Sequence, residues 1–175
     1  MYSIKTTCTI LFTALFLSLN AQPIAIDESK ATVAFVFMDD DVDGTISDFK
    51  FTGNIDLNNL TESSFSGSVA MNTLDTDNWL RNRHLRSKKY FNNKQYPRLY
   101  FKSTAVRDGG GREFLVEGTL TIKGISKPVT LTFTRRTNEL YGGVMINTGD
   151  FDINIHDESD RNMAQIRITL PYSIN

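Results

Sequence analysis

An acidic run in the sequence has the spacing of calcium ligands. It reproduces the opening D-x-D-x-D-G-x-I of an EF-hand loop, with the residues Asp39, Asp41, Asp43, Gly44 and Ile46. Such spacing suits calcium, because alternate carboxylates converge on one hard cation while the glycine allows a sharp turn. The position that requires a bidentate glutamate is Lys50, and both flanks have the pattern of strands. We therefore interpret the run as a solvated acidic hairpin tip and expect no metal site.

Only two histidines, His84 and His156, are available for acid–base or metal chemistry. His156 lies near four acidic residues that could in principle form a metal or proton-transfer site with it: Asp152, Asp157, Glu158 and Asp160. An exposed polar loop before the last strand explains the same composition, because loops are commonly polar and exposed. No Gly-x-Ser-x-Gly elbow, HExxH pair or P-loop occurs. We expect no enzymatic activity.

A basic segment near the middle of the chain is a candidate for binding an anionic group. Its members are Arg81, Arg83, His84, Arg86, Lys88 and Lys89. Guanidinium forks match phosphate oxygens, so Arg81, Arg83, His84 and Arg86 could meet the head group of a ligand. A solvated helix face with an internally hydrogen-bonded histidine accounts for the same pattern.

The phenylalanines are the third candidate feature. Twelve occur among 175 residues, and most share the parity of the apolar positions in predicted strands. The apolar positions expected to face a ligand are Phe35, Phe37, Phe49, Phe51, Phe65, Met71, Leu99, Phe101, Leu120, Leu131 and Phe133. Pattern alone is equally consistent with a packed core and with a pocket for an apolar ligand.

Short strands must position these residues, because β-branched and aromatic residues alternate with polar ones between turn signals. We predict strands at 32–38, 44–57, 63–73, 98–107, 112–122, 127–136, 140–148 and 164–172. Eight strands are enough for a small antiparallel barrel that can hold one ligand. One apolar and one polar face on each strand agree with a sheet that closes around its own interior.

The alternation stops between Leu74 and Asn93, where apolar residues are spaced irregularly among charges. We predict one or two short helices there, between the third and fourth strands, with Asp75 or Thr76 as the N-cap. In a barrel made otherwise of hairpins, such an insertion lies across an open end or packs outside.

Two longer segments carry a family resemblance. Residues 84–103 contain HLRS, YF and YPRLYFKS, and residues 118–131 read GTLTIKGISKPVTL. Together with residues 42–55, they resemble the YceI-like family of polyisoprenoid- and lipid-binding, lipocalin-like barrels. The resemblance implies a closed antiparallel barrel that encloses an isoprenoid or acyl chain, with His84 and Arg86 in the family's HLRS motif. The chain departs from the family at Lys89, where an acidic residue is common, and near Met38, where many members have a histidine.

The N-terminus has the features of a secretory signal over residues 1–21. A basic start with Lys5 precedes an uncharged apolar run from Ile10 to Leu19, and the small residue Ala21 follows. The run is too short for a membrane anchor, although an inserted N-terminal helix is the alternative. Cleavage would remove the only cysteine, Cys8, which excludes thiol chemistry from the exported protein. We therefore expect a periplasmic or secreted protein.

The remaining residues, 22–175, are expected to form one barrel domain of about 150 residues. The net charge of −1 would become −2 on loss of Lys5, which gives no reason to expect nucleic acid as a partner. No later apolar run is long enough to span a membrane.

We predict an exported, non-enzymatic protein that needs no cofactor and whose partner is an apolar lipid held inside the barrel for sequestration or transport. The lipid could be a polyisoprenoid, a quinone-like molecule or a fatty acyl chain. The main alternative is a ligand-free structural or stress-associated barrel of the cell envelope. A weaker alternative is a hydrolase or isomerase that acts on a bound lipid through His84.

Overall fold

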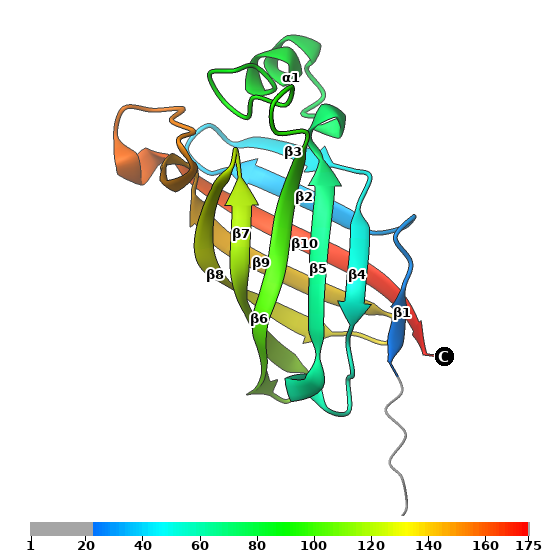
Figure 1. Ribbon diagram of the computed structural model, residues 1–175. Helices are drawn as coiled ribbons and strands as arrows, with labels where there is room; N and C mark the ends of the chain where they lie inside the picture. The colour runs from blue at the N-terminus through cyan, green and yellow to red at the C-terminus, as the bar shows by residue number, and fades with distance from the viewer. Residues whose placement is uncertain (1–22, 175) are drawn as a thin grey trace, which may run out of the picture.

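Ten strands form one antiparallel sheet that curls around an apolar interior in the computed structural model, which describes residues 23–174 (Figure 1). The strands are β1 (Ile24–Ile26), β2 (Thr32–Phe37), β3 (Val42–Ile46), β4 (Lys50–Asn54), β5 (Ser64–Ala70), β6 (Arg98–Gly110), β7 (Glu113–Ile122), β8 (Ile125–Arg135), β9 (Glu139–Asn147) and β10 (Met163–Ile174). Their order across the sheet is β3-β2-β10-β9-β8-β7-β6-β5-β4, and β1 pairs with β10. The signal peptide predicted over residues 1–21 lies outside the described residues.

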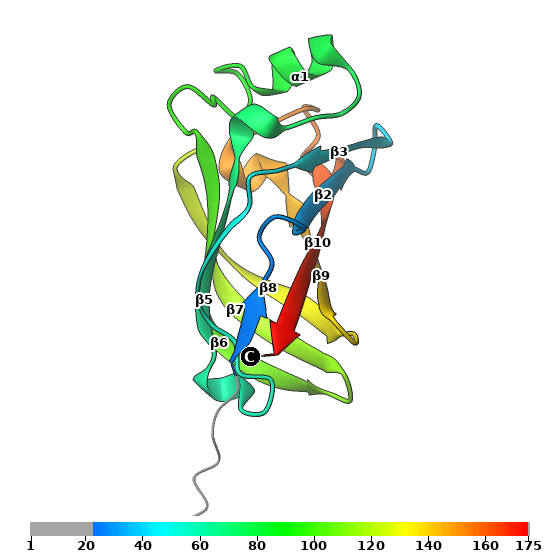
Figure 2. The same ribbon diagram turned by 90° about the vertical axis from the view of Figure 1, so that its right-hand side faces the viewer.

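Helical structure is sparse and occurs mainly at one end of the barrel. The helix α1 (Trp79–Leu85) follows β5 and η2, and the short 3₁₀ turns are η1 (Leu60–Glu62), η2 (Met71–Thr73), η3 (Thr148–Phe151) and η4 (Ser159–Arg161). Figures 1 and 2 show α1 lying beyond the end of the barrel. None of the helices in the described part of the chain has the length and apolar character needed to cross a membrane.

The predicted class, an all-β antiparallel barrel with a helical insertion between the strands now labelled β5 and β6, is confirmed. The predicted count of eight strands was wrong, because the range 44–57 contains parts of two strands. Asp48 has a positive φ of 52°, and the chain turns there from β3 into β4. The three-residue strand β1 is too short to produce an alternating pattern and was missed.

Aromatic rings fill the inner face of the sheet and lie against its wall. Phe114 and Phe133 stack with ring centroids 5.4 Å apart. The ring of Phe133 covers Gly142 on β9, and the ring of Phe101 covers Gly118 on β7, so closely that a Cβ atom at either glycine would collide with it. Gly118 and Gly142 therefore make room for these rings on the apolar face of the sheet.

The barrel closes where its two edge strands meet. β3 and β4 follow one another in the chain but are not paired, so other segments must bind their free backbone groups. Thr45 exchanges two backbone hydrogen bonds with Asp75, of 2.8 and 2.9 Å, and the Ala70 N–H donates to Ser47 O. At the other end, the Ile24 N–H donates to Ile55 O at 3.1 Å.

Side chains complete this closure. The carboxylate of Glu28, in the turn between β1 and β2, accepts the N–H of Phe51 on the edge of β4 at 2.8 Å. Arg98 donates to the carboxylate of Asp48 at 2.6 Å and to its backbone oxygen at 2.6 Å, and also to Ser68 Oγ at 3.0 Å. The crossing from β3 to β4 is thus bonded to β5 and β6 through Arg98.

The Asp48–Arg98 pair makes the stability of the seam depend on pH. The hydrogen bond from Arg98 is the main cause that lowers the pKa of Asp48 below its ordinary value. An acid with a lowered pKa in the folded state stabilises the fold above its unfolded-state pKa, and this contribution is lost as the pH falls through the folded-state value. We expect Asp48→Asn to reduce the free energy of unfolding at neutral pH and to weaken its decline below about pH 4, measured by urea denaturation.

Asparagine tolerates a positive φ, so this substitution changes the charge and leaves the turn intact. The matched control is Asp157→Asn, at an exposed carboxylate with no hydrogen bond or ion pair to another described residue. It should leave both the neutral-pH stability and the acid profile unchanged. An Asp48→Asn variant with the wild-type acid profile would contradict the assignment.

Candidate functional site

The barrel contains an internal cavity with an almost wholly apolar lining. About 130 Å³ is open to the centre of a water-sized sphere, whereas one water molecule needs only about 10–15 Å³ by this measure. Among the lining residues, Ser68, Tyr100 and Thr148 carry the only polar side-chain atoms, and none of the lining side chains is a carboxylate, imidazole or amine. The cavity can therefore accept hydrocarbon but offers no acid–base pair for catalysis.

The structure brings ten of the eleven predicted interior residues to this cavity. They are Phe35, Phe37, Phe49, Phe51, Phe65, Leu99, Phe101, Leu120, Leu131 and Phe133. The exception is Met71, which is fully buried but does not line the cavity. The prediction for Met71 was wrong because β5 ends at Ala70 and Met71 begins η2, so the strand alternation no longer applies.

Further lining residues were not among those assigned from the sequence. They are mainly Val33 on β2, Val144 and Ile146 on β9, and Ala164, Ile166, Ile168 and Leu170 on β10. The alternation in β10 was a sufficient signal for its four residues. Phe91 also lines the cavity, from the irregular segment before β6, where no periodicity could indicate it.

The segment from Leu74 to Pro97, called the cap below, covers the end of the cavity near α1. Within the cap, the side chains of Leu85, Tyr90 and Phe91 are buried, whereas those of Trp79 and Leu80 are exposed. The N-cap of α1 is Asn78, whose side-chain oxygen accepts the N–H groups of Leu80 and Arg81.

The predicted N-caps, Asp75 and Thr76, were wrong because both are used elsewhere. The backbone of Asp75 pairs with Thr45 in β3, and the Thr76 N–H and hydroxyl both donate to the buried Asn82 side-chain oxygen, at 2.9 and 2.6 Å. Asn82 in turn donates to the carboxylate of Asp75 at 2.8 Å. This hydrogen bond is the largest cause that lowers the pKa of Asp75, and the charge of Arg86 adds to it.

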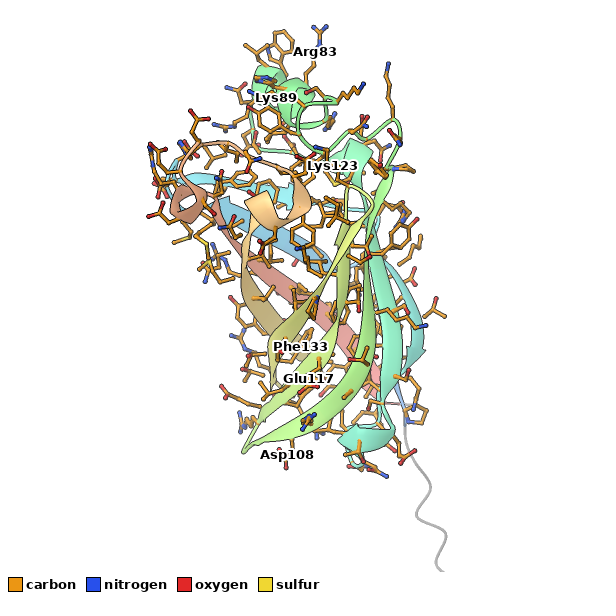
Figure 3. All side chains as sticks on the ribbon, turned by 60° about the vertical axis from the view of Figure 1, so that its left-hand side comes forward. Arg83, Lys89, Asp108, Glu117, Lys123 and Phe133 are labelled. Atoms are coloured by element: carbon orange, nitrogen blue, oxygen red, sulfur yellow. The ribbon has the colours of Figure 1, made fainter. Side chains whose placement is uncertain are left out.

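The structure divides the four predicted head-group residues into two pairs. Arg81 donates from Nε to Thr76 Oγ1 at 2.8 Å and from Nη2 to Thr76 O at 2.6 Å, and Arg86 donates to Leu74 O. These two guanidinium groups hold the cap together. Arg83 and His84 are exposed, and Figure 3 shows Arg83 directed away from the barrel.

His84 packs edge-on against the Tyr90 ring, with centroids 5.0 Å apart. Lys89 lies over the same ring, with Nζ 5.1 Å from its centroid. The basic segment is therefore not a purely solvated helix face, because several of its side chains contact other groups of the cap.

The acidic turn and the second histidine lie together at the same end of the barrel. Asp39 accepts a hydrogen bond from Arg161 at 2.5 Å, and Asp40 contacts His156 Nε2 at 3.0 Å. Asn162, which is 2% exposed, organises the loop by accepting the N–H groups of Ile155 and His156. Within the described residues, no cluster of three or more histidine, cysteine or acidic side chains has the geometry of a metal site.

The family model of the YceI-like domain matches residues 25–174, which is nearly all of the described barrel. The chain belongs to the YceI-like domain family. The UPF0312 protein plu2095 of Photorhabdus laumondii is 40% identical over 88 residues, which cover 50% of this chain and 45% of the relative. The aligned segment thus spans about half the length of the curated relatives that it matches.

Solved structures of other proteins share the fold of this YceI-like domain. Burkholderia cenocepacia BcnA superposes with a TM-score of 0.75 at 24% identity, over 85% of this chain and 99% of BcnA. A polyisoprenoid binding domain from Saccharophagus degradans, implicated in plant cell wall breakdown, gives a TM-score of 0.59 at 14% identity, over 88% of this chain and 99% of its own. At these identities the likeness shows a common barrel.

Mutation can distinguish the basic residue that holds the YceI-like cap together, Arg81, from one that is exposed, Arg83. We expect Arg81→Met to lower the free energy of unfolding by about 1–3 kcal/mol, because it removes two charge-assisted hydrogen bonds to Thr76 while keeping an apolar stem. Arg83→Met is the matched control on the same helix and should change stability by less than about 0.5 kcal/mol. Urea denaturation measures both. Equal effects at the two positions would contradict the structural role of Arg81.

Proposed function

We propose that this YceI-like domain binds a lipid with a long apolar chain, such as a polyisoprenoid, a quinone-like molecule or a fatty acyl lipid, inside its barrel. The observation that carries the proposal is the phenylalanine-lined cavity, which is enclosed by the sheet and has no charged side chain in its lining. The polyisoprenoid binding described for the Saccharophagus degradans domain of the same fold supports it.

The binding energy in this proposal comes from removing hydrocarbon from water. Each buried methylene contributes about 0.8 kcal/mol, so a chain of several carbons needs no specific polar contact along its length. Selection then depends on the shape of the cavity and on the polar end of the lipid. Of the four predicted head-group residues, Arg83 and His84 are the two that remain exposed for an anionic head group, since Arg81 and Arg86 bind backbone oxygens of the cap.

In this proposal the protein carries or sequesters the lipid, needs no cofactor and has no catalytic role. The absence of acid–base side chains from the cavity lining supports this proposal. We further propose that residues 1–21 direct export, which would place the barrel in the periplasm or outside the cell, where a hydrophobic chain needs a protein to cross water.

The first test is mass spectrometry of organic extracts from protein purified without detergent, compared with a similarly exported control protein. Co-purification of a stoichiometric isoprenoid, quinone or fatty acyl species is the expected result. A clean extract, together with a melting temperature that added long-chain lipids do not raise, would refute lipid binding, because a ligand specific for the native state must stabilise it.

A matched pair of variants tests the cavity itself. Leu120 faces the cavity from β7, and its neighbour Thr119 is on the opposite face of the same strand, in line with the period of two. Leu120→Trp should fill space equivalent to at least two methylene groups and reduce lipid affinity roughly tenfold. Thr119→Trp should leave affinity unchanged.

Lipid titration followed by fluorescence gives the affinities, and thermal melting confirms that both variants fold. Equal affinity of a folded Leu120→Trp variant and the wild type would place the ligand elsewhere.

A further inference from the structure

The wall of the barrel is incomplete between β8 and β9. β8 pairs with β7 from Ile125 to Thr134, and β9 pairs with β10 over its full length. Between β8 and β9, however, only four residue pairs form, from Arg135–Leu140 to Thr132–Gly143. Residues 125–131 of β8 and 144–147 of β9 therefore separate, although each strand stays paired on its other side.

The separation opens a groove that adjoins the lipid cavity. The groove measures about 310 Å³ and is lined by Lys127, Pro128, Val129, Thr130, Val144, Met145, Ile146, Asn147, Asp150 and Phe151. Val144 and Ile146 also line the internal cavity. These two side chains on β9 are the only residues that line both the cavity and the groove, so they lie where the two spaces meet.

Packed or hydrogen-bonded groups occupy the two ends of the barrel and the gap between β3 and β4. At the end of the barrel near α1, the cap contributes the buried side chains of Leu85, Tyr90 and Phe91. Toward the far end, the buried side chains are Val106, Phe114 and Leu140. The gap between β3 and β4 is bridged by the Thr45–Asp75 pair and by Glu28. In contrast, no side-chain hydrogen bond or ion pair among the described residues joins 125–131 to 144–147.

The rim of the groove mixes polar and apolar side chains and favours no particular charge. It carries one cation, Lys127, and one anion, Asp150, so neither sign dominates. Met145 is 46% exposed on β9, and Val129 lines the same groove from β8. A flexible thioether beside β-branched side chains adapts easily to a passing hydrocarbon chain.

We propose that the groove between β8 and β9 is the side opening through which the apolar chain of the lipid enters and leaves the cavity. This inference rests on the proposed function, because it assumes a ligand in the barrel. Widening the wall at this place breaks no ladder hydrogen bond, whereas opening any other pair of neighbouring strands in the sheet would expose paired backbone groups. Val144 and Ile146, which line both spaces, are the side chains that must move for passage.

A cross-link across the groove tests the route without altering the cavity. Continuing the register of Thr132 with Gly143 by two residues places Thr130 opposite Met145, and both are exposed. We suggest joining Thr130→Cys to Met145→Cys in the folded protein with a short, reducible bis-methanethiosulfonate. A Cys8→Ser background leaves only the introduced thiols. The probe is dansyl-labelled farnesol, whose fluorescence rises on burial.

The matched control joins Thr130→Cys to Glu117→Cys, because Glu117 is its ladder partner on β7, where the strands are already paired. Stopped-flow fluorescence should show uptake and release slowed at least about tenfold by the β8–β9 cross-link and restored by reduction. The equilibrium affinity should not change, since both rates fall together. The control cross-link should leave the rates unchanged.

Unchanged exchange rates across a complete β8–β9 cross-link would overturn the side opening while leaving lipid binding in place. Equal slowing by both cross-links would also overturn it, because the effect would then reflect general stiffening of the barrel. A protein that binds no probe before cross-linking would refute the proposed function together with this inference.

Discussion

Closure of the sheet between β3 and β4 is the constraint on which the rest of the structure depends. The two edge strands are adjacent in the chain, yet they do not pair, and buried backbone groups without partners would be costly. Groups from distant segments bond to the two edge strands and to the turn between them. These groups are Asp75 from the cap, Glu28 from the first turn, and Arg98 from β6. The cap is therefore attached to the edge of the sheet at β3. The same contacts that close the wall of the barrel also hold the cap over the cavity.

The interior stays open because its aromatic rings lie along the wall. Phe101 and Phe133 cover Gly118 and Gly142, which lack the Cβ atoms that would push the rings toward the barrel axis. A barrel of this size can be filled completely by its own side chains. The pairing of large rings with glycines on neighbouring strands instead leaves a central space, while the rings still contribute the apolar burial that stabilises the fold.

The inner face could be predicted from sequence wherever a strand alternates regularly, which is why Phe35, Phe65 and Leu131 were placed toward the cavity. Prediction failed where tertiary contacts override the local pattern. Met71 follows the parity of β5 but begins a 3₁₀ turn, and Asp75 resembles an N-cap but completes the seam. The separation of β8 from β9 cannot be seen in the sequence. Each strand is still paired with its other neighbour, so its apolar and polar residues alternate as in any strand.

Two arginines of the cap make structural contacts that the sequence pattern did not indicate. Arg81 and Arg86 have the charge expected of a head-group site, but they bind the backbone oxygens of Thr76 and Leu74. Charge-assisted hydrogen bonds of this kind are stronger than neutral ones, so they stabilise the cap, most of which lies outside the helix α1. A cap that is fixed by these hydrogen bonds is a less suitable entrance for a ligand. The weaker part of the enclosure is the wall between β8 and β9, where only four residue pairs join the two strands.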